Sequence, residues 1–385
     1  MDNISSTIYD YAIIGAGAAG LHLVHAMLAE EWFANKRILI VEKESKEVDD
    51  RTWSFWEKGK GQWDSILTKS WEKGFFYGST KEIPLELAPY QYKMMRSIDF
   101  YQLGKKAISE SSLMHWQSDV VQSVQRDGAI IKIIGTTNNY QAKQVFDSRI
   151  TKEVIKEQKD YISLIQHFKG WIIETKQAAF DPDSFVMMDY RIKKDAATSF
   201  TYVLPTSSTS AMIEFTLFDQ ELLTASDYDV YLKKYIKEIL KINDYQVIHE
   251  EIGTIPMTCF PFHKASDEGI LKIGTAGSWV KPSSGYAFKN IEKLAKQVVH
   301  NLKHNQPPDT KLLSKQFRFY DTLYLDVLAT ENELGESIFT DMYSNNPIQQ
   351  IFKFLDEETS LLENIRIFYS FRFAPFLKAL WRWVF

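Results

Sequence analysis

The feature that most constrains the fold is a glycine-rich turn close to the N-terminus, Gly15-Ala16-Gly17-Ala18-Ala19-Gly20. Apolar residues predict a strand at 9–14 before it, and the residues after it predict a helix from about 18 to 31. In this G-x-G-x-x-G spacing, Gly15 permits the tight bend, Gly17 lets the backbone approach a pyrophosphate, and Gly20 lets helix and strand pack closely. The turn therefore predicts a dinucleotide site.

A second strand and an acidic residue complete this opening unit. β-branched residues predict the strand at 37–41, and Glu42 follows it. A carboxylate there can accept hydrogen bonds from both ribose hydroxyls, while the helix N-terminus donates N–H groups to the phosphates. A purely structural glycine turn is the alternative, but strand, helix and acid together favour a dinucleotide. They do not distinguish FAD from NAD.

A second glycine-rich loop favours FAD. A predicted strand at 270–273 runs into Gly274 and Thr275, and Pro282 and Gly285 then precede a predicted helix at 288–302. Two-domain flavoproteins use such a loop to bring a second helix dipole near the flavin. Thr275 stands where many flavin hydroxylases have an aspartate. An ordinary strand–loop–helix connection is the alternative reading.

The rest of the chain divides into sheet-rich and helical parts. A β-meander with turns at Asp127-Gly128 and 136–139, a strand-rich stretch at 166–217, and helices follow the opening unit. The expected organisation is α/β, with a discontinuous cofactor domain, a substrate domain and a helical C-terminal region. The helices are expected at 100–110, at 227–240 and after Pro307-Pro308. The expected boundaries are 1–80, 98–160 and 250–306 for the cofactor domain, 81–97 and 161–249 for the substrate domain, and 307–385 for the helical region.

Composition excludes several classes of function. The net charge of -5 among 385 residues gives no basic face for nucleic acid. Cys259 is the single cysteine, which leaves no intrachain disulfide, no multi-cysteine metal site and the expectation of a small buried side chain. No apolar run reaches roughly 18 residues, and the first residues lack the basic start of a signal peptide. A cytoplasmic protein without a metal is expected.

Several motifs together resemble the lycopene cyclase family, most of all its bacterial β-cyclase branch. They occur in family order and, with the glycine turn, span residues 10 to 290. The motifs are Asp50-Arg51-Thr52-Trp53-Ser54-Phe55, Phe146-Asp147-Ser148-Arg149, Met188-Asp189, Glu251-Ile252-Gly253-Thr254-Ile255-Pro256-Met257 and Lys281-Pro282-Ser283-Ser284-Gly285-Tyr286.

The resemblance implies both a fold and an activity. The implied fold is the FAD-binding Rossmann-like fold of two-domain flavoproteins similar to p-hydroxybenzoate hydroxylase, with Arg51 among the cofactor residues. The implied activity is redox-neutral closure of β-rings on lycopene and related acyclic carotenoids, giving γ-carotene and β-carotene, by a protein that carries reduced FAD and uses NADPH only to reduce it. A FAD-dependent monooxygenase, a prenyl-chain reductase and a flavin-binding membrane scaffold remain alternatives. The sequence indicates no particular oligomeric state.

The family's catalytic glutamate falls on Glu214, in the run 212–216 that follows Val203-Leu204-Pro205. Plant members have a second acid where this chain has Phe215. On a strand, Glu214 would face away from both neighbours, and an apolar cavity would raise its pKa and keep it protonated. The alternative is a salt-bridged surface glutamate. Asp189 is a secondary candidate for a polar group in the substrate tunnel, or else an aspartate that forms a turn.

An acidic run at 354–359, Phe-Leu-Asp-Glu-Glu-Thr, resembles the plant motif more closely in its letters. It follows the 281–286 loop, whereas the family's catalytic motif precedes that loop. We therefore interpret it as a solvated acidic turn between helices.

The C-terminal residues 367–385 mix aromatic side chains with Arg372, Lys378 and Arg382. Rings and cations together suit the headgroup boundary of a bilayer, so peripheral attachment to the inner face of the cell membrane is expected. A buried closing helix is the alternative, and Pro375 is expected to kink either one.

Overall fold

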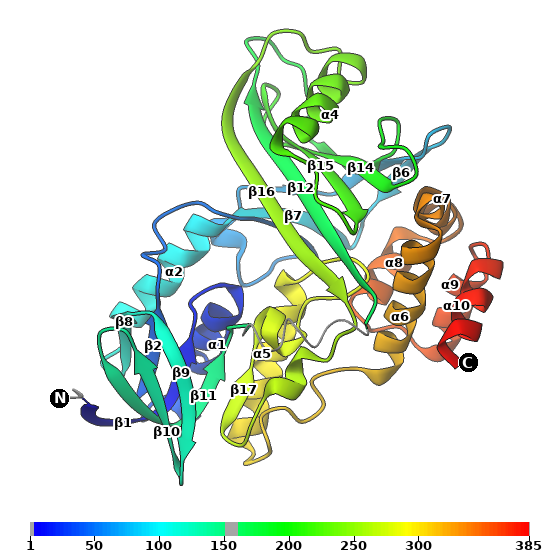
Figure 1. Cartoon of the computed structure of the whole chain (residues 1–385). Coiled ribbons are helices and arrows are strands. Elements are labelled where there is room, and N and C mark those ends of the chain that lie inside the picture. The colour runs from blue at the N-terminus through cyan, green and yellow to red at the C-terminus, as the bar shows by residue number, and fades with distance from the viewer. Residues whose placement is uncertain (1–3, 151–160, 385) are drawn as a thin grey trace.

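The computed structural model describes residues 4–150 and 161–384. Figure 1 shows a sheet with its helices at one end of the molecule, a second sheet above, and a group of helices at the opposite edge. Among the described residues, no helix is both long enough and apolar enough to cross a bilayer.

The first sheet has the order β8-β2-β1-β11-β10-β9, and β17 pairs with β11. Its centre is parallel, since β1 runs parallel to β2 and β11, while β9, β10 and β11 form the predicted antiparallel meander. Parallel pairing requires a crossover between strands, and α1 (Ala18–Leu28) provides it. The predicted βαβ opening is confirmed. The strands are β1 (Ile4–Ile14), β2 (Ile38–Glu42), β8 (Met114–Ser118), β9 (Val121–Asp127), β10 (Ile130–Gly135), β11 (Asn139–Asp147) and β17 (Ile270–Lys272).

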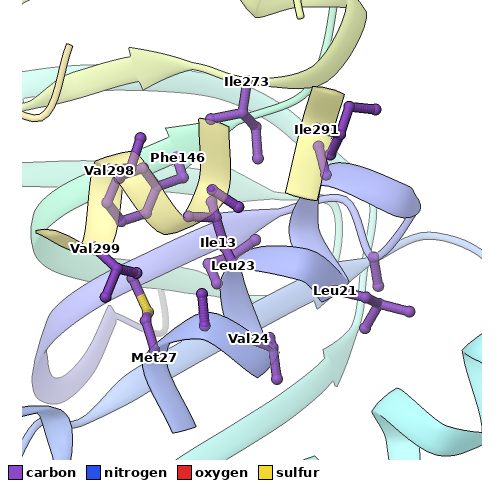
Figure 2. Packing of buried hydrophobic residues seen from close by; sticks show 14 of the residues in the cluster. Ile13, Leu21, Leu23, Val24, Met27, Phe146, Ile273, Ile291, Val298 and Val299 are labelled. Carbon is purple, nitrogen blue, oxygen red and sulfur yellow. The ribbon is translucent and has the colours of Figure 1, made fainter. Parts of the chain in front are cut away.

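One apolar core holds α1 and α5 (Phe288–Lys303) against this sheet, with α2 (Ser97–Ser109) beside them. Figure 2 shows Ile13 of β1 and Leu23 of α1 facing Val298 and Val299 of α5. All four side chains are buried, and each contributes on the order of 1.5–3 kcal/mol on leaving water. The core thus joins the two glycine-rich segments, which lie more than 250 residues apart in the sequence.

The second sheet has the order β16-β12-β15-β14-β13-β5-β6. The helix α4 (Ala225–Glu238) covers one of its faces, where Ile213 and Phe215 of the sheet pack against Leu232 and Ile236. The opposite face looks towards the first sheet. The strands are β5 (Lys73–Tyr77), β6 (Glu82–Glu86), β12 (Ser163–Glu174), β13 (Ser184–Asp189), β14 (Thr198–Pro205), β15 (Ser210–Asp219) and β16 (Gln246–Thr258).

The pairing of three strands crosses the predicted domain boundaries. β5 and the whole of β16 pair within the second sheet, although residues up to 80 and from 250 onwards were expected in the cofactor domain. β7 (Tyr90–Arg96) instead pairs with β3 (Thr52–Lys58) and β4 (Lys69–Trp71) in a small third sheet. The pairing partners are distant in the sequence, so composition along the chain does not reveal them.

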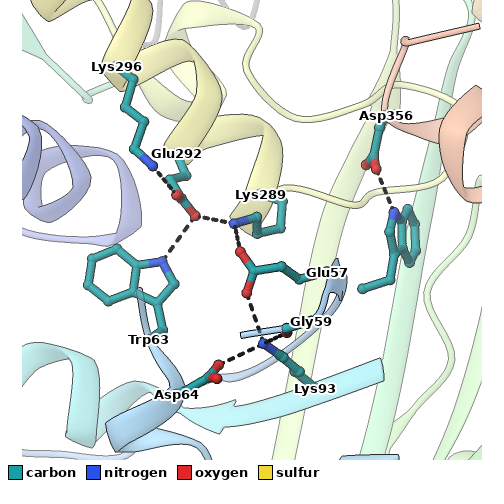
Figure 3. A network of polar contacts seen from close by, with 10 residues as sticks. Glu57, Gly59, Trp63, Asp64, Lys93, Lys289, Glu292, Lys296 and Asp356 are labelled. Atoms are coloured by element: carbon teal, nitrogen blue, oxygen red, sulfur yellow. Dashed lines mark hydrogen bonds and ion pairs between the residues drawn. The ribbon is translucent and has the colours of Figure 1, made fainter. Parts of the chain in front are cut away.

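Buried charges connect the third sheet to α5 (Figure 3). The Lys93 ammonium donates to Asp64 at 2.6 Å and to Glu57 at 3.0 Å, and Lys289 donates to Glu57 and Glu292 at 2.6 Å each. Such pairs fix a geometry more than they add net stability, because desolvation opposes the Coulomb attraction. They set the position of β3, which borders the site described below.

The helical C-terminal region, expected after Pro307-Pro308, is confirmed. α9 and α10 lie at the outer edge of the molecule, beyond α6 (Figure 1). Pro375 lies in the first turn of α10, where a missing N–H costs nothing, so it starts a helix and does not kink one as expected. The helices are α6 (Lys315–Thr330), α7 (Gly335–Asn345), α8 (Ile348–Leu355), α9 (Leu361–Phe368) and α10 (Ala374–Val384).

Candidate active site

A large cavity lies between the first sheet and the inner face of the second. Its volume is about 1090 Å³, just above the roughly 300–1,000 Å³ typical of ligand pockets. The glycine turn after β1 lines one part, and Glu214 and Glu251 line another. The cavity is therefore large enough for a dinucleotide together with part of a second molecule.

The three glycines of the first turn have the backbone geometry that their spacing predicts. Gly15 adopts φ +95°, which L side chains rarely adopt. Around Gly17 a Cβ would meet no atom within 4 Å, so its backbone is open to a ligand. A Cβ on Gly20 would lie 2.0 Å from the Gly15 carbonyl oxygen, which is why helix and strand can pack only with glycine there. Gly20 does not itself line the cavity.

Glu42 lies at the end of β2 and lines the cavity from a buried position. Its carboxylate accepts from the Ala16 N–H at 2.5 Å and from the Glu44 N–H at 2.9 Å. These bonds hold the acid beside the glycine turn. Glu42 therefore borders the cavity from the end of β2, and its contact with a ribose stays a prediction.

The second glycine-rich loop borders the same cavity. Thr275 and Gly285 line it, as does Arg51, which precedes β3. Gly285 has φ +69°, and a Cβ on it would lie 2.2 Å from Gln166 Oε1, so the close approach of loop and sheet requires glycine. Gly274 packs on Ala19, where its Cβ would lie 3.1 Å away. Gly274 and Pro282 support the wall and do not line it.

Glu214 projects from β15 into the cavity, while Ile213 and Phe215 pack beneath α4. This confirms the predicted alternation. The Thr216 hydroxyl donates to Glu214 Oε1 at 2.8 Å. Burial, reinforced by the negative charge of Glu251, raises the pKa of Glu214 from 4.5 to about 8. The carboxyl is therefore protonated at neutral pH, and it is not the surface ion pair of the alternative reading.

Glu251 is a second cavity acid to which the sequence assigned no role. It lies on β16, is buried, and accepts from the Thr52 N–H at 3.2 Å through Oε1. Burial raises its pKa, although hydrogen bonds from Thr52 oppose this. The adjacent pair Glu250-Glu251 could have indicated this acid. Two consecutive side chains on a strand point to opposite faces of the sheet, so one of the two glutamates must point to the inner face.

Aromatic side chains form part of the cavity wall, and one of them, Tyr202 of β14, pairs directly with Glu214 of β15. The hydroxyls of Tyr92, Tyr202 and Tyr286 stay neutral, because burial raises the pKa of each. Aromatic faces attract cations through their quadrupoles, so this wall suits a cationic intermediate. The aromatic lining consists of Trp53, Tyr92, Tyr101, Phe168, Tyr202, Tyr286 and Phe288.

The secondary candidate Asp189 lies outside the cavity. Its side chain is fully buried at the end of β13, where it pairs with Arg191 and accepts from the Tyr235 hydroxyl at 2.6 Å. The expectation of a polar group in the tunnel is therefore wrong. With its oxygens already bonded to Arg191 and Tyr235, Asp189 anchors α4 to the sheet.

The acidic run at 356–358 lies outside the cavity in the turn between α8 and α9, as expected, but two of its acids have partners within the protein and are not solvated. Asp356 accepts from Trp56 Nε1 at 2.8 Å, and burial raises its pKa to about 6. Glu357 pairs at 3.1 Å with the buried ammonium of Lys281, which also pairs with Asp321. These acids tie the helical region to the third sheet and to the second glycine-rich loop.

Cys259 is half-buried and not fully buried as expected, and burial raises the pKa of its thiol to about 11. Among the described residues, no three His, Cys, Asp or Glu side chains are grouped to hold a metal ion.

Comparison with protein families decides the classification. Residues 10–380, nearly the whole chain, match the family described as lycopene cyclase protein. The chain belongs to the lycopene cyclase family. No curated protein matches the chain.

Solved structures with a similar fold include flavoproteins and flavin-dependent enzymes. A geranylgeranyl bacteriochlorophyll reductase-like protein from Thermoplasma acidophilum has 15% identity and a TM-score of 0.60. The match covers 99% of this chain and 96% of the reductase-like chain. A flavoprotein/dehydrogenase from Cytophaga hutchinsonii has 11% identity and a TM-score of 0.62, covering 94% and 99%. A flavin-dependent brominase has 14% identity and a TM-score of 0.57, covering 98% and 99%. These similarities confirm the predicted two-domain flavoprotein fold.

Proposed function

We propose that this family member is a lycopene β-cyclase that closes the acyclic ends of lycopene, and of related carotenoids, without net oxidation or reduction. One observation carries the proposal: the carboxyl of Glu214, whose pKa burial raises to about 8, lies on the wall of a cavity that has aromatic residues in its lining and continues to the glycine turn. Protonating an alkene needs a carboxylic acid that keeps its proton at neutral pH and a wall that tolerates a carbocation.

FAD is the cofactor that we propose for the other part of the cavity. Gly15 and Gly17 would receive its pyrophosphate, Glu42 its ribose, and Thr275, Gly285 and Arg51 the part nearest the flavin. The open space above Gly17 and the size of the cavity fit such a group. When bound and reduced, with NADPH as the source of electrons, FAD would supply negative charge beside the developing cation.

The residues of the chain account for the first chemical steps. Glu214 gives its proton to C2 of the terminal double bond of lycopene, which leaves a cation at C1. The C5–C6 double bond attacks C1 and closes the six-membered ring, moving the cation to C5. The aromatic wall stabilises both cations and excludes water, which would otherwise trap them as alcohols.

A second cavity is our proposed seat for the part of the polyene that does not react. It measures about 230 Å³, lies among the C-terminal helices, and is lined almost entirely by apolar side chains. Ser284 lines both cavities, so they meet at the 281–286 loop. Phe373, Leu377 and Leu380 line it from the other side and are also exposed at the surface.

The outer face of α9 and α10 is our proposed contact with the cytoplasmic surface of the cell membrane. Its exposed apolar residues adjoin the second cavity, and Arg366, Arg372, Lys378 and Arg382 lie among them. A polyene insoluble in water must come from a bilayer, and this face would place the cavity against it. The exposed apolar residues are Leu361, Leu362, Ile365, Tyr369, Phe373, Leu377, Leu380, Trp381, Trp383 and Val384.

Expression in lycopene-producing cells tests the proposal. Extracted pigment should shift from lycopene to γ-carotene or β-carotene, and purified protein in D2O should add deuterium to each new ring. NADPH oxidised in proportion to product, or rings without deuterium, would indicate the monooxygenase or reductase chemistry of the alternatives.

A matched pair of variants tests the acid. Glu214→Gln should retain FAD absorbance and lose ring formation, because the amide cannot give up a proton. Asp356→Asn, in the acidic run outside the cavity, should retain ring formation. Full activity of Glu214→Gln would remove Glu214 from the acid role.

A further inference from the structure

Two cavity acids face each other across a glycine. In the second sheet Gly170 of β12 pairs directly with Glu214 of β15 on one side and with Glu251 of β16 on the other. Directly paired residues point to the same face, and strands lie about 4.8 Å apart, so the two Cα atoms are roughly 10 Å apart. A Cβ on Gly170 would lie 3.4 Å from Glu214 Cβ. Because Gly170 has no side chain, no residue of β12 stands between the two acids at this level of the sheet.

One oxygen of Glu251 is held and the other is free to react. The side chain is only 7% exposed, and Oε1 accepts from Thr52 N–H. Oε2 is buried and has no hydrogen-bond partner among the described residues. Leaving such an atom unpaired costs on the order of 1–3 kcal/mol or more. Such a cost is typical of a group that meets its partner in the reaction.

The charges around this pair are few. Arg51 and Asp49 act on Glu251 with opposite signs, and Tyr202 and Tyr286 face Glu214 as neutral hydroxyls. Glu250 points to the opposite face of the sheet, where it pairs with Lys169 at 3.2 Å. Among these charges, the negative charge of Glu251 is the one that acts on Glu214.

Ring closure needs a base as well as an acid. After the C1–C6 bond forms, the cation at C5 becomes the β-ring double bond only when the C6–H bond breaks and its electron pair forms the C5–C6 double bond. The proton must go to a basic atom on the wall of the cavity. Glu214 has then just lost its own proton and must recover one before the next ring.

We propose that Glu251 accepts the C6 proton through Oε2 and returns it to Glu214 across Gly170. This step rests on the proposed function. Glu251 begins as a carboxylate and becomes a carboxylic acid, while Glu214 changes in the opposite sense. Transfer of one proton between them restores both, and the cycle consumes no proton. The negative charge of Glu251 acts on Glu214, so the protonation states of the two carboxyls are linked.

Glu251→Gln removes the base and keeps an acceptor for Thr52. We expect retained FAD absorbance, ring formation slowed by 10²–10⁴-fold, and part of the remaining product with its double bond formed by loss of a proton other than that on C6. Glu250→Gln is the matched control, and it should form β-rings at the unaltered rate. Unaltered β-ring formation by Glu251→Gln would overturn the inference.

Gly170→Ala is a second variant, which decides the question if Glu251→Gln does not fold. It places a methyl group between the carboxyls and keeps both, and the nearest atom to its Cβ is the flexible Met212 Cε at 3.0 Å. Turnover should slow. An unaltered rate in folded Gly170→Ala would overturn the return of the proton across this gap.

An infrared titration separates this inference from the proposed function, because it needs no substrate. The C=O stretch of protonated Glu214, identified by its loss in Glu214→Gln, should disappear at a lower pH in Glu251→Gln, because the neighbouring negative charge is gone. An unmoved midpoint would overturn the coupling of the two acids. Wild-type protein without cyclase activity would contradict the proposed function, whatever the titration gives.

Discussion

At the scale of single residues, the proton on Glu214 sets the pH dependence of the reaction. Its pKa in the folded protein is raised to about 8. The fraction of protein with a protonated acid is therefore constant below that pH and falls tenfold per unit above it. We expect the rate of ring formation to follow this fall, measured as initial rates between pH 6 and 10 with FAD kept reduced. A rate that rises between pH 8 and 10 would contradict the assignment.

The same proton affects stability. The pKa of Glu214 is raised on folding, so its stabilising contribution is complete below 4.5 and is lost as pH rises towards about 8. Over this window the folded state loses at most about 1.4 kcal/mol per pH unit from this group. Glu214→Gln lacks the effect, so its free energy of unfolding relative to wild type should increase with pH. Denaturant titrations at pH 5 and pH 8 measure the difference.

At two glycines of the first turn, the same substitution to alanine should have different effects on stability. Gly17→Ala adds a methyl group where no protein atom lies within 4 Å, so the protein should fold with unaltered thermal stability but bind FAD more weakly. Gly20→Ala places its Cβ 2.0 Å from a backbone oxygen, so it should lose stability and FAD together. Thermal unfolding and flavin fluorescence separate the two. Equal FAD affinity in Gly17→Ala and wild type would contradict the pyrophosphate site.

How far sequence reasoning reaches is clear from these same residues. The glycine spacing and the alternation around Glu214 follow from local backbone geometry, and both predictions are confirmed. Asp189 was misplaced because its partner Tyr235 lies on a helix 46 residues away. Glu251 lies within one of the family motifs, but its position relative to Glu214 depends on the register of three strands, which the motif does not indicate. Side-chain partners across sheets are set by tertiary pairing, which one sequence does not display.

At the scale of secondary structure elements, α10 forms one wall of the second cavity, and Leu380 lies where this cavity reaches the surface. Leu380→Trp should fill part of the cavity without burying a polar group, so the fold should be retained. We expect KM for lycopene to rise several-fold while kcat stays near the wild-type value, because the reacting end lies in the other cavity. Leu222→Trp, at an exposed leucine outside the cavity, is the matched control. Unaltered KM in Leu380→Trp would argue against this seat for the polyene.

Sequence patterns predicted the helices well and the sheet membership of strands poorly. A helix closes its hydrogen bonds within itself, so the amphipathic stretch expected at 227–240 matches α4 closely. A strand completes its bonds on partners chosen elsewhere, and β5 joins β13, more than 100 residues later. Sheet pairing therefore crosses the expected domain boundaries at strands, and the boundaries themselves stay a prediction.

At the scale of the whole molecule, the arrangement places the reaction deep between two sheets and the apolar surface at the outer edge. The second cavity lies between them and meets the first at Ser284. The proposed path of the polyene runs from the α9–α10 surface through this second cavity to Glu214. The tie of Lys281 to Asp321 and Glu357 holds the helical region against the loop at this junction.

Membrane attachment is testable on this outer surface because its residues contribute little to the core. Leu362 is 79% exposed on α9 and Tyr369 is 82% exposed just after it, so Leu362→Glu and Tyr369→Glu should leave thermal stability unaltered. Each places a negative charge where headgroups and acyl chains would lie, so both should weaken sedimentation with vesicles of phosphatidylcholine and phosphatidylglycerol. Val230→Glu changes an equally apolar residue, 63% exposed on α4, and should sediment like wild type. The two outer-edge variants should also lose activity towards lycopene in vesicles and retain it towards lycopene in detergent, since only delivery is impaired. If both variants sedimented with vesicles as the wild-type protein does, the α9–α10 surface would have to contact a partner other than a membrane.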